Sequence, residues 1–198
     1  MVRHARLLLL LLAWTTACQA PDSRGLPPAE QVAPGVRLYR LDSVSPPTGV
    51  PGCLRRAVDD DLDCLIGWFE DFHVEVGDPA PGGPEGGAEA VRRRIADDQL
   101  WLWDDGGAVC YAGAGIAIGG VAAVGPVFTP VAKRRRGYAS ACVAAVAACM
   151  LDQGVTPVLY TDLGNPTSNS IYRRIGFRAV NEGVRYDFIP PRPNPAPT

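Results

Sequence analysis

Histidine is scarce in this chain, because His4 and His73 are the only two among 198 residues. Zinc sites and Ser-His-Asp triads use imidazole as a metal ligand or a base, so two histidines give little support to either kind of site. His73 falls near the end of a predicted helix, where a surface or satisfied core position explains it better than the role of a base. We therefore expect no metal site and assign no catalytic role to histidine.

The cysteines show no C-x-x-C pair and no spacing typical of metal ligands. A free cysteine behaves mainly as a small apolar side chain, so we interpret most of them as buried core residues. They are Cys18, Cys53, Cys64, Cys110, Cys142 and Cys149.

The chain also has no large excess of positive or negative charge. The 19 Lys and Arg residues nearly balance the 21 Asp and Glu residues, which gives a formal net charge of −2. Binding to a nucleic-acid backbone needs many basic contacts on a broad face, so we expect no nucleic-acid partner. A hydrophobic content of 47% is ordinary for a soluble globular protein, and the length is sufficient for one well-buried domain.

The first half of the chain predicts one strand and two helices. Residues 36–41 alternate between apolar and polar side chains as a strand does. The carboxylates of residues 59–61 suit a helix N-terminus, and apolar residues follow them at helical spacing. After a flexible interval at 79–87, residues 88–98 predict a second helix, in which the arginines 92–94 lie largely on a solvated face.

The second half predicts a sheet that helices cover on both sides. Residues 100–104, 108–118 and 121–129 are joined by glycine turns, which indicates an antiparallel meander. A helix over 138–151 and a strand over 155–161 come next, and a short helix after Asn165 and strands over 177–180 and 183–188 complete the pattern. The order predicts an α/β (α+β) fold with a mixed, mostly antiparallel sheet.

The domain boundaries follow from composition. Residues 1–35 comprise an apolar segment and a linker, of which 21–35 is rich in Pro, Gly and polar residues. Residues 36–189 form the folded domain, and the Pro-rich residues 190–198 are expected to be a disordered tail.

The most informative stretch joins a strand, a basic turn and an apolar helix. The first amides of a helix have no partner within the helix, and the peptide dipole is positive there, so an anion is favoured. Gly137 allows a positive φ and has no Cβ to hold a phosphate away. Arg134, Arg135 and Arg136 add charged donors. A solvated charge run beside a helix cap is the simpler interpretation, but the flanking strand and buried helix favour an anion site.

Two motifs in this region resemble those of a known family. Arg134-x-x-Gly137-x-Ala139 resembles the pyrophosphate loop of the GNAT acyl-CoA N-acyltransferases. Residues 165–177, where Asn165 is followed by Tyr172 and then by Gly-Phe, look like a later motif of that superfamily. The resemblance covers residues 37–188. It departs where Arg135 stands in place of a common Gly and Val131 in place of a common Pro.

The resemblance implies a GNAT-like fold and an acetyl-CoA cosubstrate. The loop from Arg134 to Ala139, with Ser140, would bind the diphosphate. The strand holding Val127, Phe128 and Thr129 would diverge from its neighbour and pair its backbone with the pantetheine arm, and Asn165 would contact the same arm. The cofactor-binding residues expected in full are Val127, Phe128, Thr129, Arg134, Arg135, Arg136, Gly137, Tyr138, Ala139, Ser140 and Asn165.

Tyr172 is the candidate catalytic residue. A phenol with an ordinary pKa of about 10 is protonated at neutral pH and can give its proton to a leaving thiolate. On spacing alone, Tyr172 is a core aromatic beside Ile171 and Ile175, whereas the family motif favours the donor role. Asn165 could equally be only a helix cap. The base stays unassigned, since Asp162 and Glu182 are acids of a kind common at exposed positions.

The predicted function is therefore acetyl transfer from acetyl-CoA to a primary amine by direct attack in a ternary complex. The alternatives are a non-catalytic acyl-CoA-binding module and a polyanion-binding protein. The acceptor is a small molecule or a protein amine, and we consider a homodimer for the oligomeric state. The sequence does not specify the acceptor or the preferred acyl chain.

The N-terminus leaves two interpretations open. Residues 1–20 have a basic start, an apolar run and a cleavage-like end, which fits an exported or membrane-anchored protein. The run is too short to span a membrane, and it could equally be the remnant of a longer N-terminal half. Because acetyl-CoA is a cytosolic metabolite, we expect a cytoplasmic protein.

Overall fold

The computed structural model describes residues 29–77 and 82–188. The predictions for the N-terminal apolar segment, for most of the linker and for the tail from Pro190 lie outside these residues. Within the described part of the chain, no helix is long and apolar enough to cross a membrane.

The described strands form one seven-stranded sheet in the order β2-β3-β4-β5-β6-β1-β7. Neighbouring strands are antiparallel, apart from the parallel pair β5 and β6. This confirms the predicted mixed, mostly antiparallel sheet. The strands are β1 (Ala29–Arg40), β2 (Cys53–Arg56), β3 (Leu100–Asp104), β4 (Ala108–Ala114), β5 (Val121–Phe128), β6 (Thr156–Asp162) and β7 (Arg178–Phe188).

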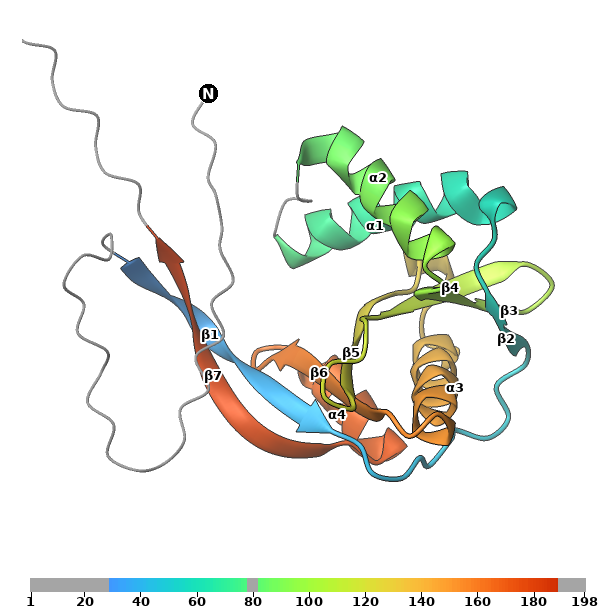
Figure 1. The fold of residues 1–198 in the computed structure, drawn as a ribbon. Helices are drawn as coiled ribbons and strands as arrows, with labels where there is room; N and C mark the ends of the chain where they lie inside the picture. The colour runs from blue at the N-terminus through green and yellow to red at the C-terminus, as the bar shows by residue number, and fades with distance from the viewer. Residues whose placement is uncertain (1–28, 78–81, 189–198) are drawn as a thin grey trace, which may run out of the picture.

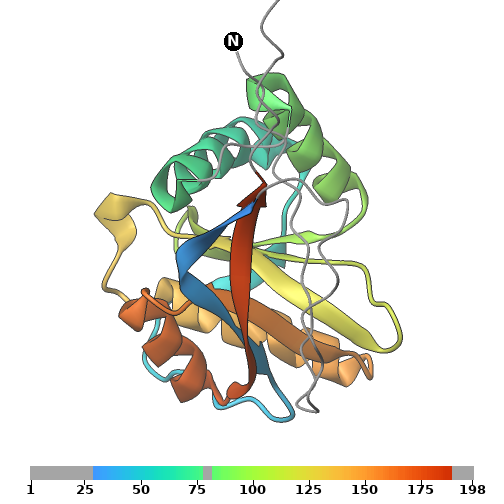
Figure 2. The same cartoon turned by 90° about the vertical axis from the view of Figure 1, so that its left-hand side faces the viewer.

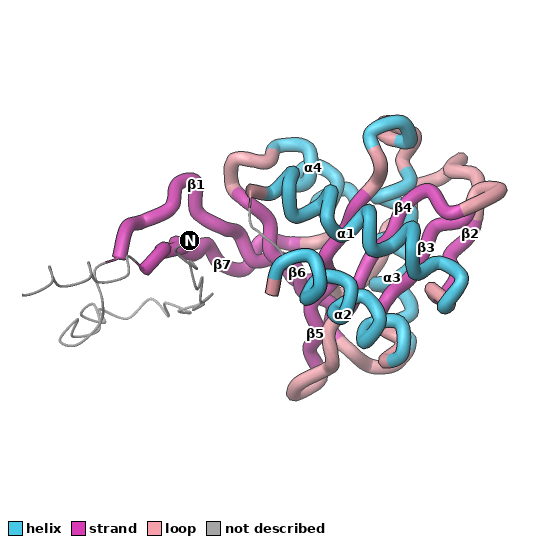
Figure 3. Tube along the Cα trace, turned by 90° about the horizontal axis from the view of Figure 1, so that it is seen from above, coloured by secondary structure: helices cyan, strands magenta, loops and turns pink. Residues whose placement is uncertain are grey.

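Helices cover both faces of the sheet, as predicted (Figure 1). One face carries α1 (Leu62–Val76), which follows the 3-10 turn η1 (Asp59–Asp61), and α2 (Gly83–Ala96). The other carries α3 (Tyr138–Asp152), which follows η2 (Val131–Lys133), and α4 (Pro166–Ile175). In Figure 2 the two helix pairs lie above and below the strands. Figure 3 shows β1 and β7 extending together beyond the other strands.

The core is divided by the sheet into two apolar clusters. The larger cluster packs α3 and α4 against the strands, and the smaller one packs α1 and α2 against β3, β4 and β5. Helix α3 consists mainly of small apolar residues and is buried on most of its surface, with Cys142 and Val146 fully enclosed. A helix buried in this way is fixed in position and direction.

Several element boundaries differ from the sequence prediction. Strand β1 begins at Ala29, inside the expected linker, and pairs with β7 from Ala29 to Arg40, with irregularities between Val32 and Val36 and between Leu38 and Tyr39. That pairing also keeps β7 continuous where two short strands were predicted. Helix α2 begins at Gly83, because Pro84 fits the first turn of a helix. The edge strand β2 was not predicted, and β4 ends at Ala114.

Two predictions about burial were wrong. Cys53 and Cys64 are exposed and Cys149 is partly buried, so only Cys110 and Cys142 among the described cysteines are core residues. Cys53 lies on the edge strand β2 and Cys64 in the first turn of α1, and both positions face solvent. Arg92 and Arg93 are exposed as expected, but Arg94 is partly buried against the sheet.

A buried asparagine joins α4 to the sheet. Asn169 is only 3% exposed and accepts a hydrogen bond of 2.9 Å from the hydroxyl of Tyr39 in β1. Its amide nitrogen donates to the carbonyl oxygens of Asp162 at 2.8 Å and Asn165 at 2.7 Å. This side chain therefore ties β1, the end of β6 and the first turn of α4 together.

Replacing Asn169 by Ala leaves the Tyr39 hydroxyl and two carbonyl oxygens without these partners. We expect the free energy of unfolding to fall by about 2–4 kcal/mol, measured by urea denaturation. Asn165→Ala, which removes only a helix cap, is the comparison and should cost about 1 kcal/mol. An equal loss in both variants would contradict the assigned role of Asn169.

Candidate functional site

Strands β5 and β6 separate partway along their length. They pair only from Val121 to Ala123 on β5 and from Thr156 to Val158 on β6, although both strands continue. On the other side of β5, the pairing with β4 shifts between Ala112 and Ala114, so that Gly125 and Pro126 form an irregularity. Gly125 and Pro126 therefore interrupt the ladder, and the second half of β5 has no strand partner toward β6 among the described residues.

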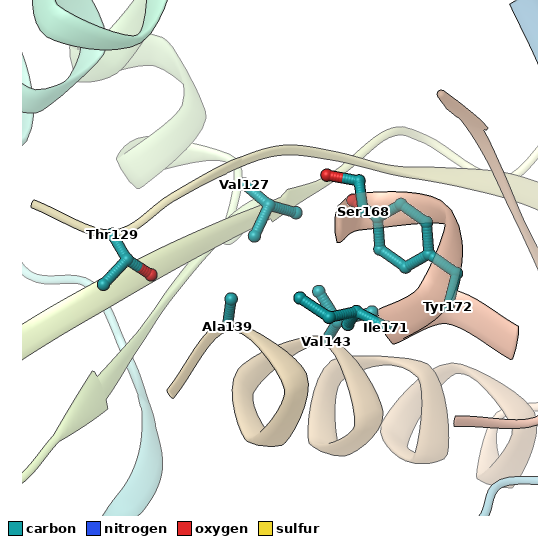
Figure 4. A pocket seen from close by; sticks show the side chains of 7 residues that line it. All are labelled: Val127, Thr129, Ala139, Val143, Ser168, Ile171 and Tyr172. Carbon is teal, nitrogen blue, oxygen red and sulfur yellow. The ribbon is translucent and has the colours of Figure 1, made fainter. Parts of the chain in front are cut away.

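A pocket of about 80 Å³ lies beside this separation (Figure 4). The pocket brings together residues of β5, the loop after it, the start of α3, and α4. Its lining consists of Val127, Thr129, Ala139, Val143, Ser168, Ile171 and Tyr172. The sequence-predicted residues Val127, Thr129, Ala139 and Tyr172 thus share one cavity.

The sequence interpretation missed some lining residues that helical spacing could have found. Val143 follows Ala139 by one turn of α3, and Ser168 precedes Tyr172 by one turn of α4. Phe128, by contrast, points to the opposite face and is buried in the cluster of α1 and α2. Any contribution of Phe128 to this pocket is limited to its backbone.

The N-terminus of α3 carries amides without acceptors. Gly137 is the N-cap residue and has a φ of 84°. No side chain caps this helix end with a hydrogen bond. The first hydrogen bond of the helix runs from the amide of Ala141 to the carbonyl of Gly137. The amides of residues 135–140 donate to no residue that the structure describes. These amides therefore lack an acceptor among the described residues, while the side chain of Val50 fills the space that a Cβ on Gly137 would need.

Arg135 adopts a conformation that favours glycine. Its φ is 63°, in the left-handed region. The motif that this loop resembles commonly has Gly here, and glycine adopts such a φ without strain. A left-handed conformation costs a residue with a Cβ about 1–2 kcal/mol, and such costs are typical of binding sites.

Two predicted cofactor-binding side chains are engaged with the protein itself. Nε of Arg134 donates to the carbonyl of Thr129 at 2.8 Å, and its Nη1 donates to Glu75 of α1 at 3.0 Å. The hydroxyl of Tyr138 donates to Asp105 at 2.5 Å, which raises the pKa of this buried tyrosine. The side chains thus hold the loop, whereas Arg135 and Arg136 are exposed. Ser140 is partly buried.

Tyr172 lies partly buried in the pocket wall. Its ring centroid is 6.3 Å from that of Tyr39 and 6.0 Å from that of Phe177, so it also belongs to the aromatic core. Burial raises the pKa of Tyr172 to about 12. The phenol is therefore protonated at neutral pH, so it has a proton to donate and cannot serve as a phenolate base.

The remaining polar candidates have local partners. The side chain of Asn165 accepts from the amide of Ser168 at 2.9 Å, which confirms its capping role. Asp162 accepts from the amide of Gly164 at 2.6 Å, and Glu182 is paired with Arg37. The ring of His73 packs against Phe69 in α1, at 4.6 Å between centroids. In the described ranges, no group of three or more His, Cys, Asp or Glu side chains is arranged to hold a metal.

Comparisons with known proteins identify the fold. The family model "FR47-like protein" matches residues 114–186. Among solved structures, a GNAT acetyltransferase from Colwellia psychrerythraea is similar with a TM-score of 0.63 and 13% identity, over 84% of this chain and 59% of that chain. A putative GNAT acetyltransferase from Novosphingobium aromaticivorans gives a TM-score of 0.58 and 22% identity, over 81% and 67%.

A third solved structure carries a ligand. It is a GNAT family acetyltransferase from Brucella melitensis in complex with acetyl-CoA, with a TM-score of 0.50 and 22% identity, over 72% of this chain and 91% of that chain. A search of curated proteins found no match. The chain therefore has the fold of the GNAT acetyltransferases, and it spans 59% of the length of the Colwellia protein.

Proposed function

We propose that the protein is an N-acetyltransferase that moves an acetyl group from acetyl-CoA to a primary amine in a ternary complex. The observation that carries this proposal is the set of free amides at residues 135–140, next to a pocket that contains the phenol of Tyr172. The protein would act in the cytoplasm, where acetyl-CoA is available, on a small-molecule or protein amine.

The N-terminus of α3 would bind the diphosphate of the donor. Phosphate oxygens accept hydrogen bonds from successive backbone amides, and the helix dipole adds a favourable potential. The exposed side chains of Lys133, Arg135 and Arg136 add positive charge around the same loop. Gly137 supplies the positive φ of the turn into the helix, and its missing Cβ leaves room for the side chain of Val50.

The unpaired half of β5 would hold the pantetheine arm. Its backbone groups beyond Ala123 have no partner on β6, so an extended amide-containing arm can pair with them as a strand would. The hydroxyl oxygen of Thr129 is buried in the pocket region without a hydrogen-bond partner, which is consistent with a group supplied by a ligand. A backbone amide near Val127 would stabilise the oxyanion that forms at the thioester carbonyl.

Transfer then needs one proton donor and one proton acceptor. The amine attacks the carbonyl carbon, a C–N bond forms, and the C–S bond breaks with its electron pair on sulfur. Tyr172 gives its proton to the thiolate, and the proton of the new ammonium leaves to water. The tyrosinate recovers a proton from solvent, so that the products are free CoA and an N-acetylated amine.

The test measures thiol release from acetyl-CoA with a panel of amines for wild-type protein and Tyr172→Phe. We expect the variant to lose about 10²- to 10⁴-fold in kcat, as is usual when a general acid is removed. The affinity for CoA should change little, because the aromatic ring remains. Thermal stabilisation by CoA with no thiol release from any amine would instead support a binding module.

The pH dependence offers a second readout of the same assignment. Because burial raises the pKa of Tyr172, the acid form persists across the neutral and mildly alkaline range. Deprotonation of Tyr172 should therefore cause no fall in kcat between pH 7 and about 10. A fall in that range that disappears in Tyr172→Phe would contradict the raised pKa.

The carboxylate of Glu75 should compete with the phosphates of CoA for the guanidinium of Arg134. This pair is partly exposed, so it is worth only about 0–1 kcal/mol and can be broken. We expect Glu75→Gln to release the guanidinium toward the phosphates and to strengthen CoA binding by about 2- to 5-fold, measured by calorimetry. Asp71→Asn, at an exposed site on the same helix, is the matched control and should change nothing. Weaker binding by Glu75→Gln would mean that the pair instead holds the loop in its binding form.

A further inference from the structure

Arg94 lies over the irregular part of the sheet. It projects from α2, on the face opposite to α3 and α4, and is partly buried. A Cβ placed on Gly113 of β4 would come within 3.2 Å of Nη1 of Arg94 and 2.9 Å of the carbonyl oxygen of Gly125. The guanidinium therefore sits at the point where β5 deviates from β4, and the lack of a side chain at Gly113 provides the space for it.

The described part of the chain supplies no counterion to this guanidinium. Among the described residues, no hydrogen bond or ion pair involves the side chain of Arg94, whereas the similarly half-buried side chain of Arg55 is bonded to both Asp61 and Asp104. Burial lowers the pKa of Arg94, which reflects an unfavourable environment for its charge. Partly buried charges in proteins are normally paired, so an anion is the missing component.

A second polar group close to Arg94 also lacks a partner. Tyr111 is 1% exposed, and its hydroxyl makes no hydrogen bond to any described residue. Tyr111 and Gly113 lie on the same face of β4, two residues apart, which places the phenol beside the guanidinium. The ring of Tyr111 is held between Trp68, at 6.4 Å, and Phe128, at 6.3 Å, so the hydroxyl is fixed in place.

We propose that Arg94 and Tyr111 bind a carboxylate of the acceptor, so that the amine substrate is an amino acid or another amine that carries a carboxylate. This inference rests on the proposed acetyl transfer. The donor pocket occupies the face of α3 and α4, and the strands are separated there, so an acceptor approaches from the face of α1 and α2. A guanidinium binds the two oxygens of a carboxylate in a planar pair of hydrogen bonds, and the phenol adds a third donor.

A phosphate could use the same donors. A phosphate monoester carries a charge of about −1.5 to −2 at neutral pH, and one guanidinium in a half-buried site compensates only part of it. We therefore assign the site to a carboxylate, and the experiment includes a phosphate-bearing amine to separate the two.

The experiment compares amines that differ only in the acidic group. Thiol release from acetyl-CoA is measured with amino acids, with the corresponding amino acid amides, and with phosphoethanolamine. The wild-type protein should prefer the acids over the amides by about 10- to 100-fold in kcat/KM, which is the usual effect of a charge-assisted hydrogen bond. Arg94→Met should abolish this preference, and Arg93→Met, at an exposed position on the same helix, should retain it. Tyr111→Phe should reduce it severalfold.

A binding readout separates this site from the transferase proposal. Thermal shifts with N-acetylglycine and N-acetylglycinamide, in the presence of CoA, test carboxylate recognition without turnover. An Arg94-dependent shift with the acid, even if no amine yields thiol, would support the carboxylate site and overturn the transferase. Turnover of amines with equal rates for acids and amides, or a preference for phosphoethanolamine, would overturn the carboxylate site and leave the transferase standing.

The melting temperature of Arg94→Met tests whether Arg94 stabilises the fold. Because Arg94→Met removes an unpaired, partly buried charge and keeps the aliphatic length, the melting temperature should stay the same or rise. A clear fall in melting temperature would show that Arg94 stabilises the fold, and would overturn the assignment to a ligand.

Discussion

The structure depends on a helix N-terminus that the protein leaves uncapped. Most helices satisfy their first amides with a side chain or with water, and a Ser, Thr, Asp or Asn at the N-cap is the usual solution. Here Gly137 occupies that position, and the preceding loop has Arg135 in a left-handed conformation. Because α3 is buried on most of its surface, its direction is fixed, and its open amides are presented at the mouth of the pocket. In the proposed function, the binding energy for the diphosphate therefore comes from the backbone rather than from flexible side chains.

The broken strand β5 divides the site into two halves with different chemistry. Toward α3 and α4 the half-site is a pocket of mixed polarity that contains the phenol of Tyr172 and lies next to the free amides at the start of α3. Toward α1 and α2 it contains the guanidinium of Arg94 and the hydroxyl of Tyr111, neither of which has a protein partner among the described residues. An intact sheet would separate these halves completely. The irregularity at Gly125 and the early end of the β5–β6 pairing are therefore the features that would allow a donor on one face to meet an acceptor on the other.

Local patterns predicted much of the fold and part of the site. The glycine turns defined the strands β3, β4 and β5, and the small-residue run defined α3, because both signals arise from neighbouring residues. Long-range pairing was not readable: β1 begins earlier than its alternation indicates because β7, far along the chain, supplies its partner. The same limit applies to the side chain of Arg134, whose carboxylate partner Glu75 belongs to a separate helix.

The acceptor side was missed for a related reason. Arg94 stands in a run with Arg92 and Arg93, and sequence alone gives no means of separating the one that turns inward from two that face solvent. From the sequence alone, Tyr111 is interpreted as an ordinary aromatic residue of a strand. Only the packing of α2 over Gly113 brings the two polar groups to the same place. The proposed donor site thus rests on residue type and spacing, whereas the proposed acceptor site follows from the tertiary arrangement.

The most direct test of the uncapped helix is amide hydrogen exchange with and without ligand. We expect CoA to slow exchange at residues 135–140, because its diphosphate accepts hydrogen bonds from these amides. Pantetheine, which lacks the diphosphate, should leave them unprotected. Tight binding of CoA without any protection in this segment would contradict the account.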